Sequence, residues 1–410
     1  MAPSAITFST PGIPKRARAR LAGPSGNFWY AVEVDSKLGK EEVLPVVFWK
    51  TDIALWRDAE GKVHAIEDRC AHRQLRLSAG FVEGDSLACC YHGWAYDAEG
   101  KVVKIAHEIP ASFRRNGGVS NPTPGESVGG AACITGDALP KISVRTYPVQ
   151  IKYGLIFLFP GDPNMADSVP LPAIPHLDEE PAVPFGSHVD LVVPASWTMI
   201  LDNNCDFYHA FLHRKFRPFV WPSLYSLSRE ELDGLDAIRV EYETDMSSSP
   251  GARALGTNTG TDKIVLHLQY PYQRSDLSAG KYAHVCFCLP MDEKTTRTFY
   301  IFTWKSMQAG PISVPYALRP PILALIHKFY LVPVLKQDLY ALSEEQRCND
   351  LHATKASVEL NPLVSAFQSM IIEKWEEYLA SERDRRSTVS RKAWRASFGA
   401  GLSDWRWADL

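Results

Sequence analysis

Two cysteine–histidine pairs stand close together in the chain. Cys70 and His72 are separated by one residue, and Cys89 and His92 are separated by two. Thiolates and imidazoles are the usual protein ligands of zinc, copper and iron–sulfur centres. Four such groups, delivered as two pairs from two loops, predict a metal site between the loops.

The mixed pairing favours an iron–sulfur cluster over zinc. A two-iron, two-sulfide cluster of the Rieske type has two Cys on one iron and two His on the other. Each loop here would supply one ligand for each iron. A Cys2His2 set also suits tetrahedral zinc, but zinc fingers pair cysteine with cysteine and histidine with histidine. Chance placement is the remaining alternative in a chain with 8 Cys and 12 His.

A second group of possible ligands lies in the segment SWTMILDNNCDFYHAFLHRKF. Asp206, His209 and His213 recur at spacings of three and four residues, which predicts one face of an α-helix. Apolar residues such as Phe207 and Leu212 surround them, and buried polar groups are costly unless they bind something. The pattern predicts a metal site, with an exposed polar face as the alternative.

The two cluster loops, CAHRQLRLSAG and CCYHGWAYDAEGKVV, resemble those of the large subunits of Rieske non-haem iron oxygenases. The resemblance implies that Cys70, His72, Cys89 and His92 hold a [2Fe-2S] Rieske cluster. The family usually has Pro where this chain has Cys90. Because Cys89 keeps the spacing to His92, we expect Cys89 to be the ligand and Cys90 its neighbour.

The downstream segment resembles the iron motif of the same family, D-x2-H-x3-4-H. By that resemblance His209 and His213 bind a mononuclear Fe(II). Asp206 is then not a ligand but the residue that bridges an iron ligand and a cluster ligand across a subunit boundary and carries the electron. The H-x3-H spacing is the variant of carbazole-dioxygenase-like members. Asn203 matches the family's Asn, which is expected just outside the ligands.

The third iron ligand has to be a carboxylate further along the chain, because two His and one carboxylate form the facial triad of such sites. In the family it stands at the start of a helix that reads roughly D-x5-E-x-Q. KQDLYALSEEQ supplies Asp338, with Glu344 and Gln346 in register. Asp350 is the second candidate, and an ordinary solvated helix acid is the alternative to both.

Length and patterning predict an α+β protein of two domains. The chain has 410 residues, more than one hydrophobic core usually supports, and is 45% hydrophobic and 22% charged. Short apolar runs between turns predict an all-β Rieske domain over 28–165, with an insertion at about 110–140. Alternating runs between the iron motifs predict an antiparallel sheet in a catalytic domain over 166–385, which the resemblance makes helix-grip-like. An arm (1–27) and a tail (386–410) complete the chain.

Charge and cysteine usage bear on partners and location. The net charge of -3 argues against bulk affinity for nucleic acid or acidic membranes, and no apolar run reaches the roughly 18 residues of a membrane span. The cysteines of so long a chain are expected to be reduced, in the cytoplasm. The resemblance implies electrons from a ferredoxin or reductase, O2 as co-substrate, a small hydrophobic or aromatic organic substrate, and a homotrimer.

These motifs predict the terminal oxygenase subunit of a Rieske non-haem iron mono- or dioxygenase, which hydroxylates, demethylates or dihydroxylates its substrate. Oxidative cyclisation or desaturation would use the same centres, and the motifs do not separate these reactions. A Rieske electron carrier would need only residues 28–160, so the second metal motif argues against it. A non-catalytic scaffold would have lost a ligand, and none is missing here.

Overall fold

The computed structural model describes most of the chain. The described residues are 8–9, 12–105, 139–179, 187–218, 221–245, 260–277, 282–304, 308–309, 312–352 and 358–398. The insertion predicted at about 110–140 lies almost wholly outside them, as does the end of the predicted tail from residue 399 onward.

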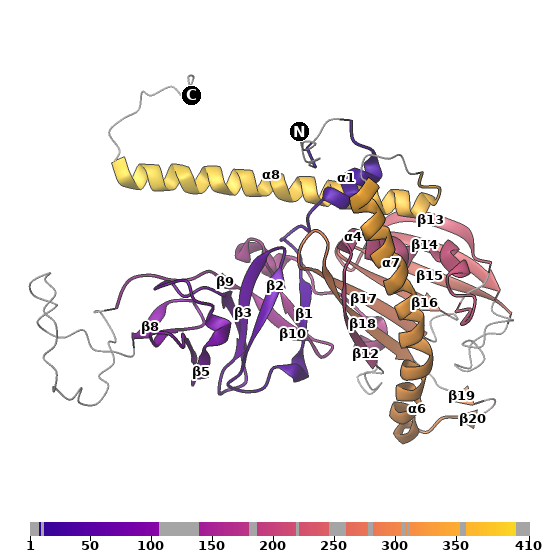
Figure 1. Ribbon diagram of the computed structural model, residues 1–410, viewed down its shortest axis with the longest axis horizontal. Helices are drawn as coiled ribbons and strands as arrows, with labels where there is room; N and C mark the ends of the chain where they lie inside the picture. The colour runs from indigo at the N-terminus through magenta and orange to yellow at the C-terminus, as the bar shows by residue number, and fades with distance from the viewer. Residues whose placement is uncertain are drawn as a thin grey trace, which may run out of the picture.

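Three small antiparallel sheets form an N-terminal β domain (Figure 1). The first contains β1 (Tyr30–Val34), β11 (Leu155–Leu158) and β10 (Val149–Lys152). The second contains β2 (Val43–Phe48), β3 (Thr51–Arg57), β4 (Val63–Glu67) and β9 (Thr146–Tyr147). The third contains β5 (Phe81–Glu83), β6 (Ser86–Ala88), β7 (Trp94–Tyr96) and β8 (Val102–Ile105). Short 3-10 helices, η1 (Asp35–Lys37) and η2 (Leu77–Ala79), lie between strands. The all-β prediction for this region is confirmed.

Two turns of the same sequence, Asp-Ala-Glu-Gly, shape this domain. In the first, Asp58 Oδ1 accepts a hydrogen bond from the Lys62 N–H at 2.7 Å, and Gly61 has φ +94°. In the second, Asp97 Oδ1 accepts one from the Lys101 N–H at 2.8 Å, and Gly100 has φ +73°. Asp stabilises such turns by bonding the backbone ahead of it, and Gly takes the left-handed conformation without steric cost.

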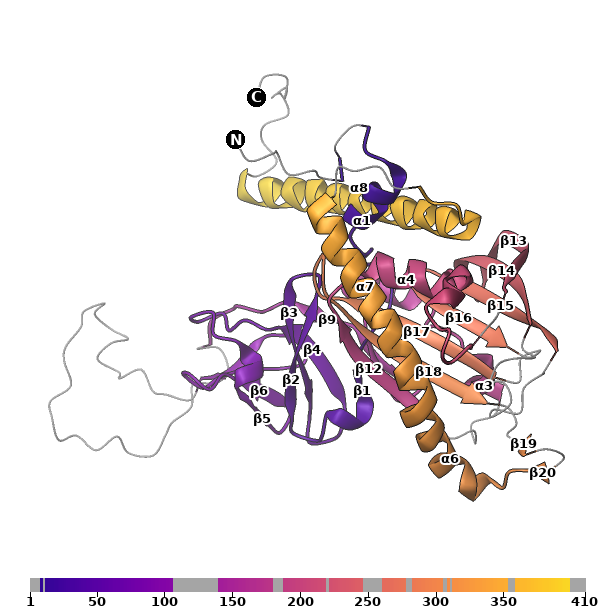
Figure 2. The same cartoon turned by 45° about the vertical axis from the view of Figure 1, so that its right-hand side comes forward.

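A seven-stranded antiparallel sheet forms the second, large-sheet domain. In spatial order its strands are β12 (Ser187–Val193), β18 (Thr296–Trp304), β17 (Tyr282–Pro290), β16 (Tyr272–Leu277), β15 (Thr261–Gln269), β14 (Leu235–Asp245) and β13 (Ser223–Leu232). Helices α4 (Trp197–Cys205), α7 (Val332–His352) and α8 (Pro362–Phe398) cover one face (Figures 1 and 2). The predicted antiparallel sheet with helices is confirmed.

Shorter elements complete the domain. They are η4 (Pro163–Ser168), α3 (Pro175–Glu179), η5 (Phe207–Phe211), the two-residue strands β19 (Gln308–Ala309) and β20 (Ile312–Ser313), η6 (Tyr316–Leu318), α6 (Arg319–Ile326) and the π-helical turn η7 (His327–Leu331), which joins α6 to α7. Among the described residues, no helix is both long enough and apolar enough to cross a membrane.

The two faces of the large sheet serve different cores. On the helical face, Ile264, Leu266 and Leu268 alternate along β15 and pack with α4, α7 and α8. On the opposite face, Phe287 of β17 belongs to a core shared with the N-terminal β domain, where its ring lies 5.4 Å from that of Phe157, edge to face. The large sheet therefore stands between the N-terminal β domain and the helices.

The N-terminal arm packs into the large-sheet domain through α1 (Lys15–Leu21), which lies along α8 (Figure 1). Arg20 is buried, and its Nη1 lies 2.8 Å from Asp202 Oδ2 on α4. Its Nη2 lies 3.1 Å from Glu345 Oε1 on α7. At the other end of the chain, α8 continues through residue 385 to Phe398, so the predicted boundary between domain and tail falls within a helix.

The buried pair of Arg20 and Asp202 makes a pH-dependent prediction. Burial raises the pKa of Asp202 to about 6, although the Arg20 charge opposes this. A carboxyl whose folded pKa lies above its unfolded value contributes most stability at low pH and loses it as pH rises through the folded pKa. Removing Arg20 would raise the pKa of Asp202 further, because the buried carboxylate would then lose the adjacent cation. The loss of stability with rising pH would therefore become larger above pH 6.

We therefore expect Arg20→Met to lower the free energy of unfolding by roughly 3 kcal/mol at pH 8 and by much less at pH 5. Urea denaturation at both pH values measures this. Arg18→Met is the matched control, because the pair of Arg18 with Glu376 is exposed and contributes at most about 1 kcal/mol. An equal loss for Arg20→Met at both pH values would contradict the account.

Candidate functional site

The segment that carries His209 and His213 is not one continuous helix. α4 begins after Ser196, whose Oγ accepts a hydrogen bond from the Thr198 N–H at 3.4 Å, and ends at Cys205. Asp206 stands between α4 and η5, and its carboxylate accepts a hydrogen bond from the Tyr208 N–H at 3.0 Å. The prediction of a single helical face was wrong, because the Asp206 side chain caps a new turn instead of continuing the old one.

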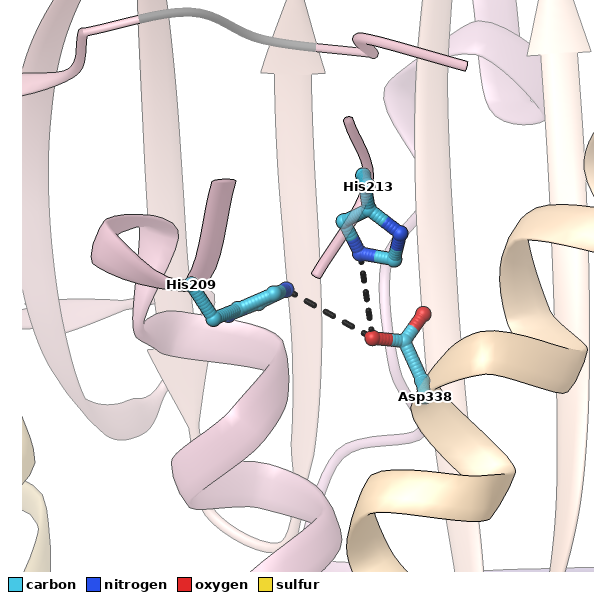
Figure 3. A group of neighbouring side chains, drawn as sticks. All are labelled: His209, His213 and Asp338. Carbon is cyan, nitrogen blue, oxygen red and sulfur yellow. Dashed lines mark ion pairs between the residues drawn. The ribbon is translucent and has the colours of Figure 1, made fainter. Parts of the chain in front are cut away.

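The short turns that follow direct both histidines toward one carboxylate of α7 (Figure 3). Asp338 Oδ1 lies 3.5 Å from His209 Nε2 and 3.1 Å from His213 Nε2. Within the described chain these three side chains form a group whose ligand atoms all lie within 4.8 Å of one another. Two imidazoles and one carboxylate around a common point are the donor set of a non-haem Fe(II) site with open positions. The donor set fits a mononuclear iron.

The structure separates the two carboxylate candidates. Asp338 lies inside α7 and reaches the histidines, although a helix start was expected there. Asp350 is occupied elsewhere, since its Oδ2 accepts from Lys294 Nζ at 2.8 Å and its Oδ1 accepts from Gln346 Nε2 at 2.9 Å. The continuous path of α6, η7 and α7 gives Asp338 its position beside the histidines.

Neighbouring groups orient the imidazole of His213 and shift the pKa of both histidines. His213 is buried, and its Nδ1 lies 2.9 Å from Gln337 Oε1, which leaves Nε2 facing Asp338. Burial lowers the pKa of His209 against the opposing charge of Asp338. For His213 burial acts in the same direction, but the hydrogen bond and charge of Asp338 outweigh it and raise its pKa. A partner on the remote ring nitrogen is the usual way a metal-binding His is held in one tautomer.

Asp206 and Asn203 lie beside this group rather than in it. Asp206 Oδ1 accepts a hydrogen bond from Asn361 Nδ2 at 3.0 Å, at the start of α8. Asn203 lines the cavity next to the histidines. The preceding residue, Asp202, points the other way, into its buried pair with Arg20.

A cavity opens above the three side chains, with an empty volume of about 870 Å³ including its mouth. Most of its wall is apolar or aromatic, and four further polar residues face it. The apolar and aromatic residues are Phe207, Pro218, Leu277, Phe302, Trp304, Tyr330, Leu331, Val334 and Leu335, and the polar ones are Asn203, Asn204, His284 and Tyr300. Such a wall suits an apolar ligand with few polar groups.

His284 is a cavity residue that the sequence reasoning missed. It lies on β17 on the same face as Cys286 and Cys288, which are buried in the core. Burial lowers the pKa of His284 to about 4, so its imidazole is neutral at pH 7 and able to donate and accept one hydrogen bond each. Strict alternation along the strand could have assigned it to the cavity face, because Cys286 is two residues away.

The cluster loops bring two cysteines inside and two histidines together. The Cys70 N–H donates to the Leu75 carbonyl at 2.8 Å, and the Cys89 N–H donates to the Trp94 carbonyl at 2.9 Å. Cys70 and Cys89 are each 2% exposed, whereas Cys90 is exposed. The rings of His72 and His92 lie 4.5 Å apart. This orientation supports Cys89 over Cys90 as the ligand.

The chemistry of this donor set also fits a metal cluster. Burial raises the pKa of the Cys89 thiol, and the nearby Cys70 adds to the effect. A pair of buried thiolates is costly without a cation between them, whereas iron binding deprotonates thiols. The Tyr96 hydroxyl lies 3.2 Å from Cys70 Sγ, within hydrogen-bond distance for a sulfur. A hydrogen bond from this hydroxyl would hold the Cys70 thiolate in position.

Comparison with known proteins identifies the family. Residues 28–114 match the Rieske [2Fe-2S] domain, and residues 193–377 match the vanillate O-demethylase oxygenase C-terminal domain. The chain belongs to the Rieske non-haem iron oxygenases, which are oxidoreductases with a [2Fe-2S] Rieske cluster and a mononuclear iron. It is 43% identical over 380 residues to the 4beta-methylsterol monooxygenase of Methylococcus capsulatus (strain ATCC 33009 / NCIMB 11132 / Bath), covering 90% of this chain and 94% of the relative.

Solved structures share the fold. Dicamba monooxygenase bound to 3,6-dichlorosalicylic acid has a TM-score of 0.63 at 22% identity, over 88% of this chain and 99% of that one. The terminal oxygenase of carbazole 1,9a-dioxygenase from Nocardioides aromaticivorans IC177 has a TM-score of 0.59 at 19% identity, over 91% and 98%. The oxygenase class predicted from the motifs is confirmed.

The orientation of the two adjacent cysteines makes one prediction. Cys90→Ser should keep the visible absorption of the cluster and its labile sulfide, because the Cys90 side chain points into solvent. Cys89→Ser should lose most of both, because a buried ligand is replaced. Iron and sulfide analysis of the purified variants measures this. Loss of the cluster in Cys90→Ser alone would reverse the assignment.

The carboxylate group makes a second prediction. Asp338→Ala should lower the affinity for mononuclear iron by more than about 100-fold, because it removes a direct ligand while leaving the cluster loops intact. Iron per chain is measured by mass spectrometry, with the cluster absorption as an internal reference. Asp350→Ala is the control and should retain its iron. Full iron occupancy in Asp338→Ala would remove that residue from the site.

Proposed function

We propose that this chain is the oxygenase component that hydroxylates a methyl group on a rigid, largely apolar polycyclic substrate of the sterol class. The observation that carries the proposal is the apolar cavity directly above His209, His213 and Asp338. The relative that is 43% identical, named for a 4beta-methylsterol, supports the same class.

The polar groups of the cavity suit such a substrate. A 4-methyl sterol has one hydroxyl, at the carbon next to the one that bears the methyl group. His284 and Asn204 line the same cavity as Asp338, where they can bond that hydroxyl while the apolar wall surrounds the rings. Binding the hydroxyl would orient the adjacent methyl group toward the metal. The balanced reaction takes R–CH3, O2, two electrons and two protons to R–CH2OH and water.

We assign the site residues as predicted. His209, His213 and Asp338 would hold the mononuclear iron, and Cys70, His72, Cys89 and His92 would hold the cluster. When bound, the iron supplies the reduction of O2 that oxidises a C–H bond. The protein's own part is to hold the ligands, with Gln337 orienting His213, and to keep water from the substrate with the aromatic wall.

The electron route favours a ring of three subunits. In one chain, the large sheet intervenes between the N-terminal β domain and the helical face that carries His209 and His213. A neighbour's cluster could instead approach Asp206 from outside. Exposed aromatic residues stand at both ends of that route, Tyr91 beside the cluster and Tyr208 and Phe211 beside Asp206, and a neighbouring subunit would cover them.

A ferredoxin or reductase is the proposed electron donor, as for the family in general. We also propose a cytoplasmic location. The seven described cysteines are free of disulfides, which supports a reducing compartment. We propose the Rieske domain over 28–165 and a catalytic domain that begins at 166 as predicted, and that continues with α8 past the predicted end at 385.

Asp206→Asn tests the bridging role. We expect both metals to stay bound and the rate of electron transfer from cluster to iron to fall by about 100-fold or more. The reason is that a neutral amide cannot replace the carboxylate that would accept hydrogen bonds from an iron-binding His and a cluster-binding His. Single-turnover reoxidation of the reduced cluster measures this. Asp350→Asn is the same exchange at a carboxylate that binds Lys294, about three turns beyond Asp338 on α7, and it should transfer electrons normally. Loss of mononuclear iron in Asp206→Asn would make Asp206 a ligand.

The function itself is tested by single turnover with the chemically reduced, metal-loaded protein. A 4-methyl sterol should yield one hydroxymethyl product per iron, with one oxygen atom from 18O2. A methoxylated benzoate, as a small aromatic alternative, should give no product, because its carboxylate has no cationic partner among the lining residues and its single ring covers little of the apolar wall. The reverse outcome would replace the sterol class with demethylation of small aromatic compounds, and a desaturated or cyclised product would replace hydroxylation.

A further inference from the structure

The helix that leads into the cavity wall exposes large apolar side chains. Leu318, Leu325 and Phe329 are 53%, 57% and 65% exposed. Their spacings of seven and four residues align them in one stripe along η6, α6 and η7. Leu323, on the opposite side of α6, is buried in the core. Both views show α6 at the far end of α7 from α8 (Figures 1 and 2).

The stripe is continuous with the wall of the cavity. Tyr330 and Leu331 directly follow Phe329 and line the cavity, as does Val334 one turn later. The Tyr330 ring also meets the ring of Phe216 at 6.0 Å, and Pro218, two residues beyond Phe216, lines the cavity as well. An apolar molecule that lies on the stripe is therefore next to the cavity mouth.

Three cationic residues adjoin the stripe and the cavity wall in the chain. Lys328 Nζ lies 5.4 Å from the ring centre of Phe329. Lys215 Nζ lies 5.6 Å from the ring centre of Phe216. Arg217 is exposed beside Phe216. The sequence has no Asp or Glu from 294 to 337 or from 207 to 218. These two stretches are therefore basic, although the net charge of the whole chain is -3. We name the three apolar residues with Lys215, Arg217 and Lys328 the entrance surface.

We propose that the entrance surface docks on a lipid bilayer with anionic headgroups, so that an apolar substrate passes from the membrane into the cavity. An exposed stripe of Leu and Phe flanked by Lys and Arg is typical of helices that lie in the membrane interface. Cations near an anionic surface add attraction that salt weakens. The acid-free stretches favour an anionic partner over a second copy of this chain, whose net charge is close to zero.

The substrate route rests on the proposed function, but the docking does not. The test therefore uses the full-length, metal-loaded protein with vesicles and without substrate or reductant. Co-sedimentation should detect binding to phosphatidylcholine vesicles that contain phosphatidylglycerol, weaker binding to phosphatidylcholine alone, and release by added salt.

Two variants probe the surface. The double variant Leu325→Ser with Phe329→Ser should weaken partitioning to the anionic vesicles by about ten-fold or more, because it removes the inserted apolar area. Lys328→Glu should weaken it by about five-fold or more, because it reverses one charge near the surface. Ile151→Ser on β10 and Lys101→Glu beside β8 are the matched controls, exposed on the other domain, and should bind like the unchanged protein.

Cluster absorption and molar mass confirm that each variant is folded and assembled. Absence of binding to both vesicles, or equal binding by the entrance variants and the controls, would overturn the proposal. So would a change of oligomeric state in the double variant, which would assign the stripe to a second copy. Vesicle binding without sterol turnover would leave the docking intact and reject the proposed function instead.

Discussion

The meeting of Asp338 with His209 and His213 is the contact on which the rest of this enzyme depends. The histidines follow the end of α4, and the carboxylate projects from α7. A metal site tolerates little displacement of its ligands, so the two helices must be held firmly in relation to each other.

Polar ties between the two helices meet that requirement. The Ser196 N–H at the start of α4 donates to Gln346 Oε1 on α7 at 2.9 Å. Arg20, from the N-terminal arm, lies between Asp202 of α4 and Glu345 of α7. Buried polar groups are costly when unsatisfied, so these contacts favour one relative arrangement of the helices. The arm is thus part of the framework of the site.

The two faces of the large sheet pack against different parts of the molecule. One face carries the proposed iron ligands and the apolar cavity, and the other packs against the domain that carries the cluster. The division separates the cavity from the N-terminal β domain of its own chain, and in the proposed trimer a neighbour's cluster would deliver the electrons. On the cavity side, the same helix that carries Asp338 continues through η7 into α6, so a single element joins the proposed metal site, the cavity wall and the entrance surface.

Short-range patterns in the sequence identified the candidate ligands of the cluster loops and the two histidines. Cys89 and His92 lie within one loop, and His209 and His213 lie within neighbouring turns, so their spacing alone keeps each pair close together. The same patterns identified the strands of the large sheet through their alternation. Asp338 was found only through the family resemblance, since nothing local relates it to residues more than a hundred positions away.

Tertiary structure decided the rest. It replaced the predicted helical face with a capped break at Asp206, because a carboxylate that bonds the backbone ahead of it ends one helix and starts a turn. It selected Asp338 over Asp350, which lies about three turns further along α7 and pairs with Lys294 instead. It also brought His284 to the cavity and Arg20 between α4 and α7. Sequence by itself determined which residues could bind metal, whereas packing of distant segments on one sheet decided which of them meet, because such contacts depend on the whole core and not on local spacing.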